Sequence, residues 1–345
     1  METIKQKTDY RIIQDKKTID WLINNSEVFV FDPLTFKGYQ RELEEAHWKK
    51  IINYIIDNDD FFFPTSIICA CDEVYTDNSR LRIVDGQHRI QAFRELEKIH
   101  KDKYDKILDK ELPIIVLEKI PLTKEIETFI NINKKGKKVD TSLATVLNHT
   151  ISDKDDLEKR KAKIEYIAVE VARELSLKEG NIWENQICFE GNAKKHNQLI
   201  SINAFVRSTQ FLLSNLDNSG IQIINWDSKI ELEQCKIECI NLIMYIWELI
   251  IKKWPELFSK TVGSNSIIQG PIGYSSINKF IVFLLKKNTI NNKNDFKKIL
   301  EEWINKISVQ YTKWIPGESG ISYSNYSSEA GYTFVANALI DSMNI

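Results

Sequence analysis

The sequence predicts an α+β protein in which a mixed N-terminal domain precedes a mostly α-helical C-terminal domain. Between residues 41 and 131, segments with helical spacing of apolar residues alternate with short apolar segments typical of strands. Beyond about residue 140, the spacing of apolar residues is mostly helical. The chain of 345 residues is also longer than one hydrophobic core usually organises. We therefore predict two domains, 1–147 and 148–345.

The predicted elements of the first domain follow one another closely, whereas residues 1–30 give no clear pattern. They are a helix at 41–56, strands at 66–75 and 81–84, a helix from Ile90, a strand at 112–118 and a helix at 125–131. The second domain is expected to contain helices at 197–213 and 231–254. This order of elements predicts a small sheet with helices packed on it, followed by a helical bundle.

Composition and charge exclude several classes of protein. Hydrophobic residues make up 43% and charged residues 28%, which is typical of a globular chain. A net charge of −2 gives no overall attraction to nucleic acid, so a DNA contact would need a local basic patch. Neither a signal peptide nor an apolar run long enough for a membrane span is present, and we expect a cytoplasmic protein. Five cysteines without framework spacing favour buried packing over a metal site.

The strongest local signal is the segment Asp85-Gly86-Gln87-His88-Arg89, which follows the apolar strand residues Ile83 and Val84. A strand that turns directly into a helix directs free backbone N–H groups at one point, where an anion can bind. Gly86 allows the turn, Arg89 is a forked donor suited to phosphate, and His88 can carry a proton near neutral pH. Asp85 could hold Mg²⁺ or orient water. Equally, Asp85 could simply cap the helix, with His88 and Arg89 solvated.

These five residues are the name-giving motif of the DGQHR-domain proteins, and the chain resembles that family. The family includes DndB-type proteins of DNA phosphorothioation and a related component of DNA 7-deazaguanine (7-deazapurine) modification. It is similar to the ParB/sulfiredoxin-like superfamily, in which the same strand-to-helix turn receives nucleotide phosphates. Two flanking segments add to the resemblance, Tyr39-Gln40-Arg41 upstream and Phe129-Ile130-Asn131-Ile132-Asn133 with Gly136 downstream. The resemblance implies a ParB/sulfiredoxin-like N-terminal domain.

The resemblance also implies roles for individual residues. The catalytic set would be Asp85, His88 and Arg89, with Asp85 as the Mg²⁺ ligand. The nucleotide-binding set would be Gln40, Arg41, Gly86, Gln87, Asn131 and Asn133. The lysines around Gly136 could contact a nucleic-acid backbone: Lys134, Lys135, Lys137 and Lys138. Each has an ordinary alternative, because Arg41 and the lysines could be solvated and the asparagines could cap a helix. His47 is a weaker candidate.

Three hypotheses for the function remain at the level of the sequence. The first is an ATP- or NTP-binding and hydrolysing component of a bacterial DNA-modification system that defends against phage, with Mg²⁺ as cofactor. Its partners would be the other proteins of that system, DNA and further copies of the chain in a homo-oligomer, with no membrane. The second is a DNA-binding regulator of the modification operon without catalysis, and the third, least favoured, is a ParB-like nuclease. No Walker-type P-loop is present, so hydrolysis would be of another type.

Overall fold

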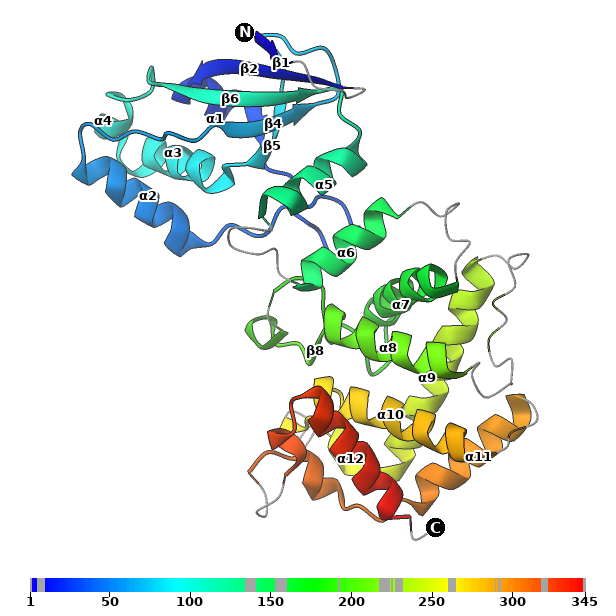
Figure 1. Ribbon diagram of the computed structural model, residues 1–345. Helices are drawn as coiled ribbons and strands as arrows, with labels where there is room; N and C mark the ends of the chain where they lie inside the picture. Colours follow the sequence, from blue (N-terminus) through cyan, green and yellow to red (C-terminus); the bar gives the residue numbers. More distant parts are fainter. Residues whose placement is uncertain are drawn as a thin grey trace. The chain divides into compact units, whose positions relative to one another are not determined.

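The computed structural model describes residues 2–4, 10–133, 141–152, 160–191, 193–216, 224, 226, 232–259, 265–288, 290, 293–317 and 322–343. They form an α+β protein, which confirms the predicted fold class (Figure 1). The chain divides into two compact units, Met1–Ile151 and Ser152–Ile345, whereas the sequence prediction placed the division between residues 147 and 148.

The first unit is built on a six-stranded sheet with the order β1-β2-β6-β4-β5-β3. Its strands are β1 (Glu2–Ile4), β2 (Arg11–Thr18), β3 (Ser26–Glu27), β4 (Ile67–Cys71), β5 (Leu81–Asp85) and β6 (Glu111–Glu118). Its helices are α1 (Ile19–Asn25), α2 (Glu45–Asp57), α3 (Gln87–Ile99), α4 (Lys101–Tyr104), α5 (Leu122–Asn133) and α6 (Thr141–Ile151). Strands and helices therefore alternate along most of this unit, as the sequence indicates.

The pairing of β5 determines where the motif lies. β5 runs antiparallel to β4 and parallel to β3, and the register pairs Ile68 with Asp85. A register shift between Ile68 and Cys69 adds a local irregularity to β4 at this point, and such irregularities in strands are common next to functional sites. Because the two strands are antiparallel, the residues just before β4 lie beside the residues just after β5.

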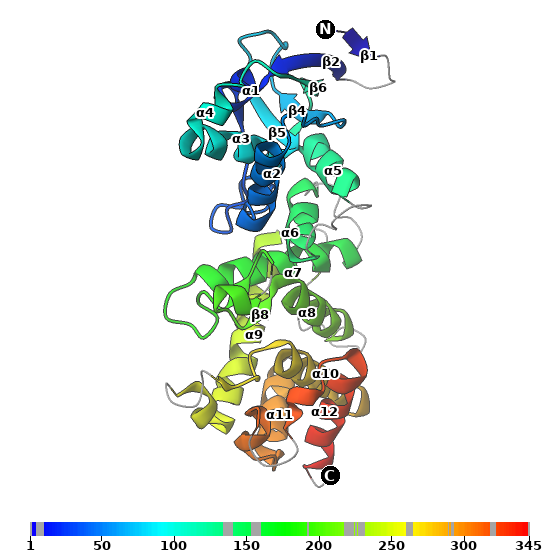
Figure 2. The ribbon, with the colours of Figure 1, turned by 90° about the vertical axis from the view of Figure 1, so that its left-hand side faces the viewer.

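The core of the first unit lies between the sheet and a layer of helices. α3 contacts α1, α2 and α4, and both views show α2 and α3 side by side (Figures 1 and 2). One apolar face of α3, made of Ile90, Phe93 and Leu96, is fully buried in the same cluster as Ile83 of β5. This packing fixes α3 to the strand that precedes it, so the turn between them has little freedom.

One predicted feature of the first unit differs from the structure, and one segment without a prediction proves to be ordered. Helix α2 begins at Glu45, so Gln40 and Arg41 precede the helix instead of lying at its start. Gln40 instead forms an isolated parallel bridge with Val30. Residues 10–30, which gave no clear pattern, contain a strand at the interior of the sheet, a helix and a short edge strand.

Among its described residues, the second unit is mostly helical, and its one pair of strands joins β7 (Ile187–Cys188) to β8 (Ile200–Ser201). Its α-helices are α7 (Arg160–Leu177), α8 (Ile202–Leu216), α9 (Leu232–Lys253), α10 (Pro271–Lys287), α11 (Lys293–Lys306) and α12 (Glu329–Asp341). Short 3₁₀ helices span Ala193–His196, Pro255–Phe258, Tyr311–Trp314 and Tyr323–Asn325. An aromatic cluster lies in its core. The ring of Phe205 stacks on that of Tyr274 with centroids 4.5 Å apart, and the ring of Trp183 packs edge-on against that of Trp247 with centroids 4.8 Å apart.

Candidate functional site

The motif occupies the junction between β5 and α3. Asp85 ends the strand, Gly86 is the N-cap residue, and the helix begins at Gln87. The backbone N–H groups of Arg89 and Ile90 donate to the carbonyl oxygen of Gly86, at 3.0 and 3.1 Å. No side chain caps the helix start, so the predicted alternative role of Asp85 as a cap is not what the structure shows. The N–H groups at the first two positions of an α-helix, which here precede Arg89, find no carbonyl acceptor within the helix and carry partial positive charge.

Gly86 is required by the backbone at this turn. Its φ is +105°, in the left-handed region that side chains with a Cβ rarely adopt. A Cβ here would lie 3.0 Å from Nη2 of Arg89 and 3.2 Å from Ile67. The turn therefore depends on glycine for its backbone conformation and for the close approach of two side chains.

A polar pocket of about 260 Å³ opens at this turn, and all three sequence segments of the family resemblance contribute to it. Its lining residues are Gln40, Arg41, Thr65, Asp85, Gly86, Gln87, His88, Arg89, Phe129 and Asn133. These come from the segment before α2, the residues before β4, the β5–α3 junction and helix α5. Residues as far apart in the sequence as Gln40 and Asn133 are thus gathered around one helix start.

Gln40 is buried and holds the end of β5 in place. Its Nε2 donates to the carbonyl oxygens of Ile83 and Val84, at 2.8 and 2.9 Å. Both amide hydrogens are therefore used on the strand that carries the motif. Although the sequence predicts Gln40 as a nucleotide-binding residue, its donors position the pocket wall, while Arg41 beside it lines the pocket.

Arg89 is also tied to the backbone. Its Nη1 donates to the carbonyl oxygen and hydroxyl of Thr65, at 2.6 and 3.1 Å, and its Nη2 donates to the carbonyl oxygen of Ser66 at 3.0 Å. Nη2 lies 3.9 Å from the Asp85 carboxylate. Burial lowers the pKa of Arg89, and the charge of Asp85 opposes that effect. The guanidinium thus joins the start of β4 to the start of α3 while adding positive charge to the pocket.

Replacing Arg89 by lysine is expected to lower the free energy of unfolding by about 1–2 kcal/mol, because one ammonium cannot reproduce the forked contacts to two carbonyls. Urea unfolding checks this. The matched control is Arg80→Lys, since the exposed Arg80 makes a single ion pair with Glu27 at 3.4 Å, and we expect its effect to stay within about 0.5 kcal/mol. Equal effects of the two substitutions would contradict the role assigned to Arg89.

A second histidine ring packs against His88, the histidine that lines the pocket. The ring of His47, on α2, packs edge-on against the ring of His88 with centroids 5.1 Å apart. His47 also lies 3.5 Å from the Glu44 carboxylate. The sequence gives His47 only a weak claim, because the contact depends on how α2 packs on α3. The structure thus places a second imidazole next to the motif histidine.

Gln87 presents an unused acceptor. The residue is only 7% exposed, lines the pocket, and its Oε1 has no hydrogen-bond partner among the described residues. A buried amide oxygen without a donor costs about 1–3 kcal/mol, so such a group is usually satisfied by water or by a ligand. Gln87 is therefore suited to accept a hydrogen bond from a molecule in the pocket.

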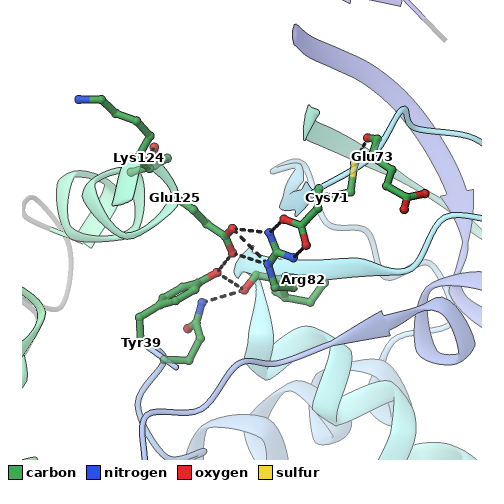
Figure 3. A network of polar contacts seen from close by, with 10 residues as sticks. Tyr39, Cys71, Glu73, Arg82, Lys124 and Glu125 are labelled. Atoms are coloured by element: carbon green, nitrogen blue, oxygen red, sulfur yellow. Dashed lines mark hydrogen bonds and ion pairs between the residues drawn. The ribbon is translucent and has the colours of Figure 1, made fainter. Parts of the chain in front are cut away.

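A buried ion-pair network supports the pocket from the side of α5 (Figure 3). Arg82 on β5 donates to the Glu125 carboxylate through Nη2 at 2.8 Å and through Nε at 3.1 Å. It also donates to the Asp72 carboxylate, through Nη1 at 2.7 Å and through Nη2 at 2.8 Å. The hydroxyl of Tyr39 donates to Glu125 Oε1 at 2.6 Å. Hydrogen bonds to both carboxylates raise the pKa of Arg82. Sequence analysis missed this network, which joins β5, α5 and the segment that leads to Gln40.

Not every predicted residue joins the pocket. Asn131 is exposed and does not line it. Asn133 does, but its Nδ2 donates to the carbonyl oxygen of Phe129 at 2.9 Å within α5. The predicted DNA-contacting residues Lys134, Lys135, Lys137 and Lys138 lie outside the described residues.

The described part of the chain offers no group of three His, Cys, Asp or Glu side chains that could hold a metal ion. Mg²⁺ has a weaker requirement, since it keeps several waters and binds through one or two carboxylates together with substrate phosphates. The carboxylate of Asp85, partly exposed in the pocket, fits that pattern.

The five cysteines are buried and unbridged, and burial raises the pKa of the Cys69 thiol. None of the described helices is both long and apolar enough to span a bilayer.

The fold and the pocket together define an α+β protein of the DGQHR class, with the motif at a strand-to-helix turn. Residues 24–307 match the family DndB, described as DNA-sulfur modification-associated. Because the match covers more than half of the chain, the protein belongs to the DndB family and is a component of a multi-protein DNA phosphorothioation system. Neither a curated protein nor a solved structure gives a further match.

Proposed function

We propose that the pocket at the β5–α3 junction binds the phosphates of a nucleoside triphosphate, such as ATP, and catalyses its hydrolysis. The observation that carries this proposal is the convergence of three separate sequence segments on one polar pocket at a helix start. Helix starts bind phosphate through backbone N–H groups and the helix dipole. Arg41 and Arg89, which both line the pocket, add positive charge to it.

The size of the pocket suits the phosphate end of such a ligand. Its volume of about 260 Å³ is below the roughly 300–1,000 Å³ of pockets that enclose a small molecule. The triphosphate would enter the pocket, and the base and ribose would remain near its mouth. Oε1 of Gln87, which has no partner among the described residues, would accept a hydrogen bond from a hydroxyl of the ligand or from a water.

The residues present can support the hydrolytic step. The oxygen of a water molecule forms a bond to the γ-phosphorus, and the bond from this phosphorus to the β–γ bridging oxygen breaks. Asp85 orients the water, His88 accepts its proton, and the helix-start N–H groups stabilise the charge on the departing diphosphate. Mg²⁺, held by Asp85 and the phosphates, would neutralise further phosphate charge. In a modification system, this turnover would drive or gate the partner proteins that act on DNA.

The test measures phosphate release from ATP and the other nucleoside triphosphates with Mg²⁺, with and without duplex DNA. Asp85→Asn is expected to lower the rate at least about 100-fold, because the carboxylate that positions the water is lost. The matched control is Asp109→Asn, which neutralises an exposed carboxylate of the same unit and should leave the rate unchanged. Equal rates for wild type and Asp85→Asn would show that the release does not come from this pocket.

A further inference from the structure

The second unit contains a pocket of about 460 Å³ that no part of the function proposed above uses. It is formed by residues of α8, α10 and α12, together with Pro271 at the start of α10. Its lining residues are Asn203, Ala204, Arg207, Ser208, Phe211, Pro271, Ser275, Lys279, Glu329 and Tyr332. The volume lies within the usual range for small-molecule sites, and the lining combines charged, hydroxyl and aromatic side chains.

Lys279 places a buried cation in this pocket. The residue is 8% exposed, and its Nζ lies 4.6 Å from the ring centroid of Phe211. Its ion-pair partner is Glu329, with Nζ 2.6 Å from Oε1. The Glu329 side chain, however, is 70% exposed. Burying an ammonium costs free energy that a well-placed anion offsets, and an exposed carboxylate can be replaced in that role by a ligand.

Arg207 supplies a second cation. It is exposed, lines the same pocket, and makes no ion pair with any residue that the structure describes. Burial and the Glu329 carboxylate raise the pKa of Tyr332, and the charge of Arg207 opposes them. Both charges therefore act on the same phenol at the pocket wall. The pocket holds two cations and one carboxylate, which leaves one positive charge for a ligand.

We infer that this pocket binds a phosphate ester, with the phosphate held between Arg207 and Lys279 and with Glu329 displaced from Lys279. The hydroxyl groups of Ser208 and Ser275 would add neutral hydrogen bonds, and Ser208 is itself fixed by a hydrogen bond from Asn278 Nδ2 at 2.9 Å. The phosphate ester could belong to a free nucleotide or to the backbone of DNA. This inference does not depend on hydrolysis at the β5–α3 junction.

The test uses the full chain and two photoreactive probes, an azido-ATP and a short duplex DNA with a photoreactive base. Crosslinked peptides of α8, α10 and α12 are quantified by mass spectrometry against probe concentration, separately from peptides of the first unit. Arg207→Gln and Lys279→Met are each expected to raise the half-saturating concentration about tenfold, since each removes a charged hydrogen bond. Glu329→Gln should lower it roughly threefold by removing the competing carboxylate.

The half-saturating concentration is expected to rise in Arg207→Gln and Lys279→Met and to fall in Glu329→Gln. This difference distinguishes a lost ligand contact from a loss of folding, because unfolding would weaken labelling in all three variants. Lys286→Gln, which neutralises an exposed lysine near the end of α10, is the matched control and should change nothing. Labelling by ATP alone identifies a nucleotide site, and labelling by DNA alone identifies a backbone contact. The inference is overturned if none of the three substitutions changes the half-saturating concentration for labelling of these helices, or if neither probe labels them.

Discussion

Replacing Glu125 by alanine is expected to lower the free energy of unfolding of the first unit by about 3 kcal/mol, among the largest stability effects of a single substitution in this chain. Glu125 is fully buried and accepts hydrogen bonds from Arg82 and from the Tyr39 hydroxyl. Its removal leaves the guanidinium with only the exposed Asp72 as partner. A buried cation that loses its main counter-charge is costly because water does not fully replace it.

Two variants make this prediction specific. Asp72→Ala removes a carboxylate that pairs with the same Arg82, but its side chain is 73% exposed, so we expect a loss below about 1 kcal/mol. Glu125→Gln keeps the shape and an acceptor and should lie between the two. Urea unfolding gives the free energies, and hydrogen exchange of peptides from β5 and α5 assigns them to this unit. Similar losses for Asp72→Ala and Glu125→Ala would refute the view that the buried carboxylate dominates.

Gly86→Ala is expected to reduce nucleotide hydrolysis about 100-fold, because a displacement of about 1 Å at a catalytic site has an effect of this size. Alanine at a φ of +105° is strained, and its Cβ would force the side chains of Arg89 and Ile67 to move. Since Arg89 joins the start of β4 to the start of α3, its movement would shift the helix-start N–H groups away from the phosphate.

The matched control is Gly180→Ala in the second unit. Gly180 has a φ of +76°, and no atom lies within 4 Å of the position of an added Cβ. This control therefore carries the backbone strain, about 1–2 kcal/mol, without any displaced neighbour. Phosphate release should be unchanged in Gly180→Ala. A Gly86→Ala protein that remains folded and releases phosphate at the wild-type rate would contradict the importance of the turn.

The fold class and the position of the motif could be predicted from the sequence because both depend on local patterns. Ile83 and Val84 mark a buried strand, Gly86 marks the turn, and the spacing of Ile90, Phe93 and Leu96 marks a helix face. The helix begins at Gln87, earlier than the apolar spacing suggests, because the first helical residues are polar and line the pocket, whereas the spacing records only the apolar face.

The contacts that shape the site could not be predicted in this way. Arg89 donates to the carbonyl oxygens of Thr65 and Ser66 only because β4 and β5 pair antiparallel. Since every residue has a backbone carbonyl, such acceptors cannot be recognised from residue types in a sequence. The approach of His47 to His88 depends on the packing of α2 on α3. The network of Arg82 and Glu125 joins residues 43 positions apart in the chain.

The N-terminal strand β2 was missed for another reason. Its sequence, Arg-Ile-Ile-Gln-Asp-Lys-Lys-Thr, contains one fully buried residue, Ile13. The remaining positions are polar or partly exposed, although the strand pairs with β6 along its whole length and with β1 from Ile12 to Gln14. Backbone hydrogen bonds hold such a strand in place without the alternation of apolar and polar residues by which strands are recognised.

The way Gln40 is bound has a consequence for the kinetics of ligand entry. Because its amide group donates to two carbonyl oxygens at the end of β5, Gln40 can move away from this wall of the pocket only if both hydrogen bonds break in a local unfolding event. The cost in conformational entropy of ordering this wall is met when the chain folds and not when a ligand arrives. Association should therefore be a single concentration-dependent phase, with no slower rearrangement following it.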